Sequence, residues 1–131
     1  EVAGRLWTKT LYGDPPFWVQ PNLGNEDVLR GVPNKRFRDN SAQSATAEIR
    51  YNFALALPFI DGWLGKDWQL AAFAETGRVG DDFASASTGT LHHSAGIGGR
   101  LIFNERVGAM RGDLGFSEHG VALIVKFNQA F

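Results

Sequence analysis

Apolar and polar residues alternate with a period of two along most of the chain. In residues 121–131, Val121, Leu123, Val125, Phe127 and Phe131 share one side, and mostly small or polar residues occupy the other. Successive side chains of a strand point to opposite faces, so this pattern predicts a strand rather than a helix. The same reasoning predicts strands over about 41–58, 67–77, 91–103, 109–116 and 121–131, with a weaker one over 5–12.

The two faces of these strands differ in chemistry. One face is apolar and carries Ile49, Tyr51, Phe53, Leu70, Ala95, Ile97, Leu101, Leu123, Val125 and Phe127. The other carries the charged residues Glu48, Arg50, Glu75, Arg100, Arg111 and Asp113. Soluble sandwiches and small barrels also alternate, with the apolar face packed inward. The charges favour a membrane barrel, because they would line its polar lumen while the apolar face meets lipid.

The predicted connections alternate in length. Residues 58–66 and 104–106 form compact links, whereas 12–40 and 79–90 form long loops. Long loops on one rim and short turns on the other are typical of outer-membrane barrels. We therefore expect an all-β, antiparallel, up-and-down transmembrane β-barrel region over 1–131, with the long loops outside the cell. Hairpin links and the lack of a crossover helix predict that strands adjacent in sequence pair with each other.

Several short motifs follow one another in a recognisable order. They are LRGV at 29–32, RFRDN at 36–40, AEIRY at 47–51, FAETG at 73–77, SAGIGGR at 94–100, RGDLGFS at 111–117 and the terminal Phe131. In this order they resemble the C-terminal barrel of the bacterial surface antigen family, the outer-membrane assembly and translocation barrels of BamA type. The resemblance implies a segment that acts in insertion or translocation of proteins at the bacterial outer membrane.

The resemblance also bears on completeness. The family's motifs belong to the last six strands of a sixteen-strand barrel, and closed outer-membrane barrels begin at about eight strands. The chain begins at Glu1 rather than Met. We therefore expect either the C-terminal part of a longer protein or a chain that completes a barrel with other copies. Its expected partners are outer-membrane lipid, those remaining strands, and client outer-membrane proteins or assembly machinery.

Two groups of site residues follow from the resemblance. It implies that the loop 12–40 folds back into the lumen and that Arg30, next to Gly31, meets Glu48 and Glu75 on the inner wall. The family usually has Asp where Glu75 stands, so Glu48 is expected to be the main partner. The resemblance also implies that Phe127 and Phe131 form a C-terminal assembly signal, with simple lipid-facing side chains as the alternative.

Composition removes several other functions. With 13 Lys+Arg against 14 Asp+Glu, the formal net charge of −1 makes nucleic acid an unexpected partner. The absence of Cys excludes a disulfide framework and thiolate metal ligands. No serine nucleophile motif is present, so we expect neither catalytic residues nor a cofactor.

The histidines suggest a metal site only weakly. His92 and His93 are adjacent, so on a regular strand they face opposite sides and cannot bind one ion together. We therefore expect no metal, and His92, His93 and His119 as solvated loop-end residues. The functional alternatives left open are a passive outer-membrane anchor, a binding barrel, and a soluble all-β binding module.

Overall fold

The computed structural model describes residues 1–24, 28–33, 36–54, 67–102 and 109–128, and its main feature is one antiparallel sheet. The six strands of this sheet follow the order β1-β4-β5-β6-β7-β8, so strands pair with their neighbours in sequence, as the meander prediction required. The strands are β1 (Val2–Thr10), β4 (Ser41–Ala54), β5 (Asp67–Gly80), β6 (His92–Ile102), β7 (Ala109–Ser117) and β8 (Gly120–Asn128). The predicted all-β, antiparallel class is therefore confirmed.

Some strand limits differ from the sequence prediction. The blurred alternation at 5–12 corresponds to β1, which starts earlier, at Val2, and ends at Thr10. β5 continues past the predicted end at 77 to Gly80, pairing with the start of β4 through Ser41. The predicted ends at 58, 103 and 131, including Phe131, lie outside the described residues.

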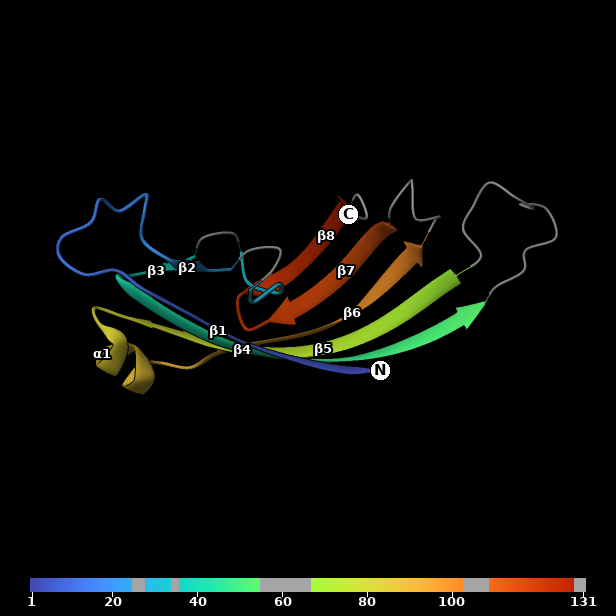
Figure 1. Ribbon diagram of the computed structural model, residues 1–131, viewed down its shortest axis with the longest axis horizontal. Helices are drawn as coiled ribbons and strands as arrows, with labels where there is room; N and C mark the ends of the chain where they lie inside the picture. The colour runs from blue at the N-terminus through green and yellow to red at the C-terminus, as the bar shows by residue number, and fades with distance from the viewer. Residues whose placement is uncertain (25–27, 34–35, 55–66, 103–108, 129–131) are drawn as a thin grey trace.

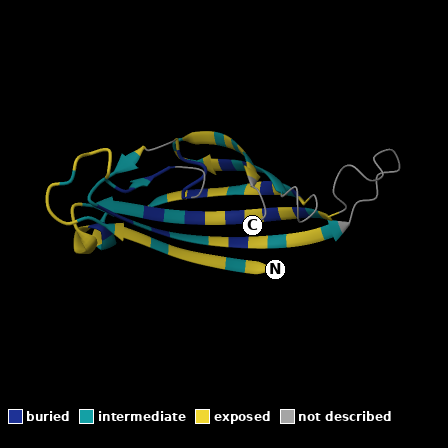
Figure 2. Ribbon diagram, turned by 45° about the horizontal axis from the view of Figure 1, so that its top comes forward, coloured by how far each residue is buried: buried dark blue, intermediate teal, exposed yellow. Residues whose placement is uncertain are grey.

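The sheet is curved, and its two faces differ in exposure (Figures 1 and 2). On the convex face, large apolar side chains are exposed: Ile49, Tyr51, Leu70, Ile97, Leu123, Val125 and Phe127. On the concave face, polar and charged side chains are buried, among them Glu48, Gln69, Glu75, Ser94 and Asp113. This is the assignment of faces that the alternation predicted.

Leu101 is an exception. The alternation places it on the apolar outer face, yet it is only 3% exposed. Its register partners are Trp68 on β5 and Met110 on β7. Residues directly opposite one another in a sheet project to the same side at close range, so these two large side chains flank Leu101.

The connection between β1 and β4 lies over the concave face (Figure 1). It carries the two short paired strands β2 (Asn22–Leu23) and β3 (Phe37–Arg38). Its apolar residues Leu23, Val28, Leu29 and Val32 form a buried cluster with Ala42 of β4, against which Trp7, Phe37 and Val79 pack. A long polar-looking loop thus contains its own apolar anchor, which holds it against the sheet.

The connection between β5 and β6 was expected as a loose loop but contains a helix, α1 (Phe83–Thr88). Asp82 explains the difference, because its side chain accepts a hydrogen bond from Ser85 N at 2.7 Å and Ser85 Oγ accepts one from Asp82 N at 2.9 Å. This reciprocal capping box satisfies amides that a helix start otherwise leaves unpaired. Among the described residues, no helix is long and apolar enough to cross a bilayer.

Candidate functional site

The buried arginine of the folded-in loop is the centre of the candidate site. Arg30 is 2% exposed, although it belongs to a connection and not to a strand. A tight turn presents it to the sheet: Val32 N donates to Leu29 O at 2.9 Å, and Leu29 has a positive φ of 53°. Non-glycine residues adopt this region uncommonly. The buried Leu29 side chain, which packs in the loop cluster, holds the turn in place.

Three carboxylates from three strands surround the Arg30 guanidinium. Nε lies 2.8 Å from Oε1 of Glu75 on β5, and Nη2 lies 3.0 Å from Oε2 of Glu48 on β4. Nη1 lies 3.0 Å from Oδ2 of Asp113 on β7. The structure thus brings Arg30 together with the two expected acids and adds a third. The planar guanidinium has donors pointing in several directions, so it can serve all three, which a lysine ammonium on a flexible stem could not do equally well.

Glu75 is the main partner, contrary to the expectation for Glu48. Its Oε1 accepts from Arg30 Nε, and its Oε2 accepts from the Arg30 backbone N at 2.6 Å. Ser94 Oγ donates to the same Oε2 at 3.1 Å. The longer Glu side chain therefore reaches both the side chain and the backbone of the loop. Glu48 gives Arg30 one oxygen and uses the other for Arg50 and Arg100, each at 2.6 Å.

Asp113 is the acid that the sequence analysis did not assign to Arg30. It is fully buried, and it also pairs with Arg111, whose Nε lies 2.5 Å from Oδ2. Asp113 shares the inner face with Glu48 and Glu75, a placement that the alternation already gave. What the sequence could not show was the register of β6 and β7, which places Gly98 opposite Asp113. A Cβ added at Gly98 would collide with the carboxylate of Asp113. A glycine on the neighbouring strand therefore makes the space in which Asp113 sits.

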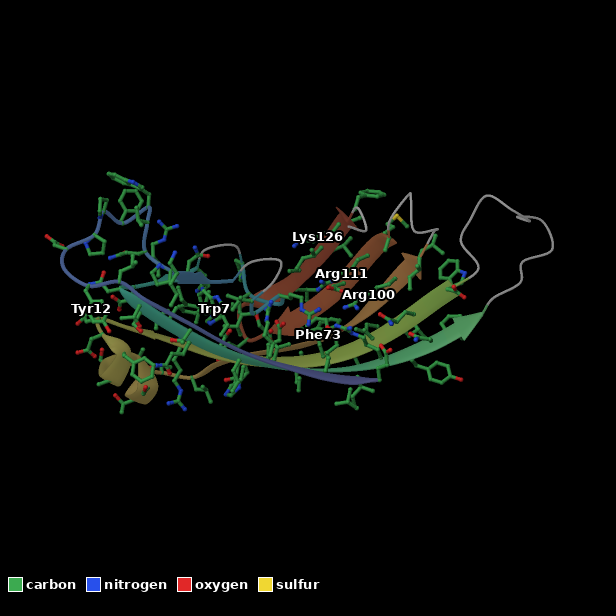
Figure 3. All side chains as sticks on the ribbon, viewed as in Figure 1. Trp7, Tyr12, Phe73, Arg100, Arg111 and Lys126 are labelled. Atoms are coloured by element: carbon green, nitrogen blue, oxygen red, sulfur yellow. The ribbon has the colours of Figure 1, made fainter. Side chains whose placement is uncertain are left out.

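The aromatic ring of Phe73 completes the setting. The Arg30 guanidinium carbon lies 3.5 Å from the centroid of this ring, which is itself buried. Figure 3 places Phe73, Arg100 and Arg111 on the concave side of the sheet. Burial alone would lower the pKa of Arg30, but the carboxylates of Glu75 and Asp113 outweigh it and hold that pKa above its ordinary value. Arg30 is therefore a permanent cation in a desolvated place.

Gly31 brings the loop backbone into contact with β7. A Cβ at Gly31 would lie 2.7 Å from the backbone carbonyl of Phe116, and one at Gly115 would lie 2.7 Å from Gly31 N. Real Cβ atoms do not approach so closely, so both positions require glycine. Ser117 Oγ donates to Gly31 O at 2.6 Å. Gly31 was expected to accompany Arg30, and the facing glycine on β7 explains why the loop can approach so closely.

We call Arg30, Glu48, Glu75 and Asp113 the loop lock. Its cation is in direct contact with three acids and an aromatic ring, so the arrangement holds the loop against the sheet. Of the expected assembly signal, Phe127 is 76% exposed on the convex face, and Phe131 is outside the described residues.

The histidines are placed differently from expectation. His93 is exposed, whereas His92 and His119 are partly buried and face Glu118. These three are a group that could hold a metal ion. No family model, no curated protein and no solved structure matches this sequence.

Proposed function

We propose that the chain forms part of the wall of a transmembrane β-barrel in the bacterial outer membrane and acts in the insertion or translocation of proteins there. The observation that carries the membrane part is the exposed apolar convex face. Ile49, Tyr51, Leu70 and Ile97 are each more than half exposed, as are Leu123, Val125 and Phe127. They lie on β4, β5, β6 and β8 of one sheet.

The energetic cost of this face in water favours lipid as its neighbour. Leaving one large apolar side chain in water instead of burying it forgoes about 1.5–3 kcal/mol. Soluble monomers rarely expose contiguous apolar patches of more than a few hundred Å². The charged residues occupy the opposite, buried face, so the sheet is apolar outward and polar inward. That is the pattern of a membrane barrel wall.

The proposal requires further strands. β1 and β8 are the edges of the described sheet. In a bilayer, unpaired edge amides cost several kcal/mol each, so both edges need partners. They come from a longer chain or from other copies, and strand addition at β1 or β8 supplies them without any change in the sheet.

The insertion or translocation role rests on the family resemblance and on the loop lock. A loop tied to the inner wall by a buried cation keeps a fixed position inside the lumen. A passive anchor has no need of such a fixed loop. The resemblance of the motifs around Arg30, Glu75 and Asp113 to those of the surface antigen family supports the same role.

Membrane orientation is tested by cysteine scanning of β8. The chain has no native Cys, so each introduced thiol is the only one. Single variants Leu123→Cys and Val125→Cys, and their inward neighbours Ile124→Cys and Lys126→Cys, carry an environment-sensitive fluorophore in phospholipid vesicles. We expect quenching by brominated lipid at 123 and 125 only. Equal behaviour at all four positions would refute the membrane wall.

The activity is tested separately in the vesicles that pass this scan. A urea-unfolded outer-membrane barrel is added as client, and its folding is followed by the appearance of its heat-resistant band on gels. We expect faster client folding than in vesicles holding an equal mass of an unrelated outer-membrane barrel. Equal rates, with the alternating quenching pattern intact, would exclude the insertion activity and leave the passive anchor.

A further inference from the structure

Two histidines lie close together at the rim of the sheet. Ser94 of β6 pairs with Ser117 of β7, the last pair of this ladder, and the two-residue turn Glu118-His119 then leads to Gly120 of β8. This turn lies beside the start of β6, and the ring centroids of His92 and His119 are 5.9 Å apart. Adjacency of His92 and His93 in sequence had argued against a metal site, but the β7–β8 turn supplies the second imidazole.

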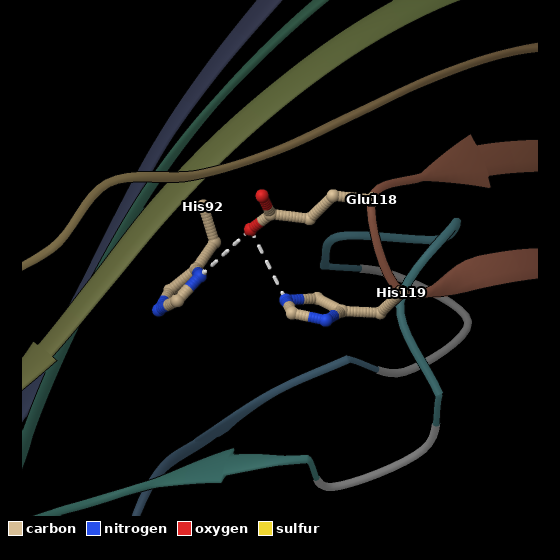
Figure 4. Close-up of side chains that lie close together, drawn as sticks. All are labelled: His92, Glu118 and His119. Carbon is tan, nitrogen blue, oxygen red and sulfur yellow. Dashed lines mark ion pairs between the residues drawn. The ribbon is translucent and has the colours of Figure 1, made fainter.

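Glu118 lies between the two rings (Figure 4). Its Oε1 is 3.6 Å from His92 Nδ1 and 3.1 Å from His119 Nε2. One ligand atom from each of the three residues lies within 4.8 Å of the others. Four ligands at about 2.0–2.1 Å in a tetrahedron around Zn²⁺ are about 3.3 Å apart. Both nitrogen-to-oxygen separations are close to that value.

The two ring nitrogens that face Glu118 lack hydrogen-bond partners. His92 Nδ1 and His119 Nε2 are both buried without a partner in the described part of the chain. Buried polar atoms are nearly always satisfied, so an unsatisfied pair aimed at one point calls for an explanation. A metal ion at that point accepts the lone pairs of both nitrogens, which neither contact with Glu118 satisfies as a hydrogen bond.

Phe37 packs against both imidazoles, and hydrogen bonds hold the backbones of His92 and His119. The ring of Phe37 stacks on His92 with centroids 3.6 Å apart and an interplanar angle of 16°, and it lies 5.2 Å from the ring of His119. Thr76 Oγ1 donates to His92 O at 3.2 Å, and His119 N donates to Ser117 Oγ at 3.1 Å. Ligands that are held before binding lose less conformational entropy when the ion arrives.

We propose that His92, Glu118 and His119 form a binding site for a divalent transition-metal ion, with Zn²⁺ as the best fit. Two imidazoles and one carboxylate are a common zinc ligand set, with water in the fourth position. Glu118 has 64% of its side chain exposed, so ion and water enter from its side. The ion ties the β7–β8 turn to the start of β6. Ser117 joins that turn to Gly31, so the metal site is next to the loop lock.

The site is independent of the proposed membrane function, and its test needs no client protein. The untagged full chain, folded in detergent micelles, is titrated with ZnCl₂ by calorimetry. We expect one ion per chain. Glu118→Gln is the main variant, because an exposed side chain can be changed without disturbing the fold, and His92→Ala and His119→Ala remove the other ligands. His93→Ala is the matched control on the same strand.

We expect each of the three ligand variants to weaken Zn²⁺ binding at least about tenfold, since even residues behind the ligands are worth about 10–100-fold in affinity. His93→Ala should bind as the unchanged chain does. Amide exchange of residues 117–120 should slow on adding Zn²⁺ only where the site is intact. Absence of one-to-one binding by the unchanged chain, an unaffected Glu118→Gln variant, or an equal loss in His93→Ala would each overturn the proposal.

Discussion

Replacing Arg30 by alanine removes the cation of the loop lock, and the structure indicates how large the effect should be. Glu48 keeps Arg50 and Arg100, and Asp113 keeps Arg111. Within the described chain, Glu75 keeps only the Ser94 hydroxyl and the backbone N of residue 30. One buried carboxylate is therefore left without a cation, and not three.

An uncompensated charge of this kind costs about 3–5 kcal/mol. We expect Arg30→Ala to lower the free energy of unfolding by that amount, or to release the loop and raise amide exchange in residues 28–33 where the loop opens independently. The four Trp residues report denaturant unfolding in micelles, and mass spectrometry reports the exchange. Arg36→Ala is the control, because this arginine lies in the same connection and is exposed.

A second variant tests the assigned cause. Adding Glu75→Gln to Arg30→Ala removes the stranded charge and keeps a side chain that can accept from Ser94, so about 2 kcal/mol or more should return. Arg30→Lys should fall between Arg30→Ala and the unchanged chain. A loss below about 0.5 kcal/mol for Arg30→Ala, the range of ordinary surface substitutions, together with unchanged amide exchange in residues 28–33, would refute the loop lock. Failure of Glu75→Gln to restore stability would refute Glu75 as its main partner.

Three further predictions concern the loop contact, the outer face and the helix cap. Gly31→Ala should destabilise the chain by about 1–3 kcal/mol in denaturant unfolding, because its Cβ would overlap the β7 backbone, whereas Gly112→Ala has open space and should be nearly neutral. Val125→Arg should lower the free energy of folding into lipid by about 2–4 kcal/mol, and Lys126→Arg on the opposite face should not. Hydrogen bonds from Ser85 hold the pKa of Asp82 below its ordinary value, so the α1 cap is complete above about pH 4 and is lost as pH falls through the lowered pKa. Protection of the α1 amides from exchange should therefore fall as the pH falls through that range. In Asp82→Ala this pH dependence should be absent.

The alternation of residues was enough to predict the six long strands and the face of most of their side chains, and the hairpin links predicted their order. A period of two alone predicts that Val125 and Lys126 lie on opposite faces of β8. The position of Leu101 was not predictable in this way, because its burial depends on Trp68 and Met110, which register alone places beside it. Side-chain periodicity defines a face but contains no information on the alignment of neighbouring strands.

In the candidate sites, too, the face of a side chain was predictable and its neighbours on other strands were not. Glu48 and Glu75 were assigned to Arg30 through the family resemblance, and alternation independently placed both on the inner face. Alternation also places Asp113 on the inner face, but nothing in the local sequence connects it to Arg30, which is 83 positions away. The proximity of His92 to His119 likewise depends on the pairing of β6 with β7, which brings the β7–β8 turn beside the start of β6 and becomes known only when the strands are paired. Helix α1 was missed because six residues are too few to show a helical period.

The spread of the loop lock along the chain has a consequence for the order of folding. Arg30 meets Glu48, Glu75 and Asp113 at sequence separations of 18, 45 and 83 residues. The hairpins from β4 to β8 close at separations of 3 to 15 residues, shorter than the 45 and 83 of Glu75 and Asp113, and so form earlier, because closing a longer loop costs more chain entropy. The complete set of acids, and the β7 surface that receives Gly31, exist only after the sheet has formed as far as β7. Docking of the loop is therefore a late step, and substitutions in it should speed unfolding and leave the folding rate nearly unchanged.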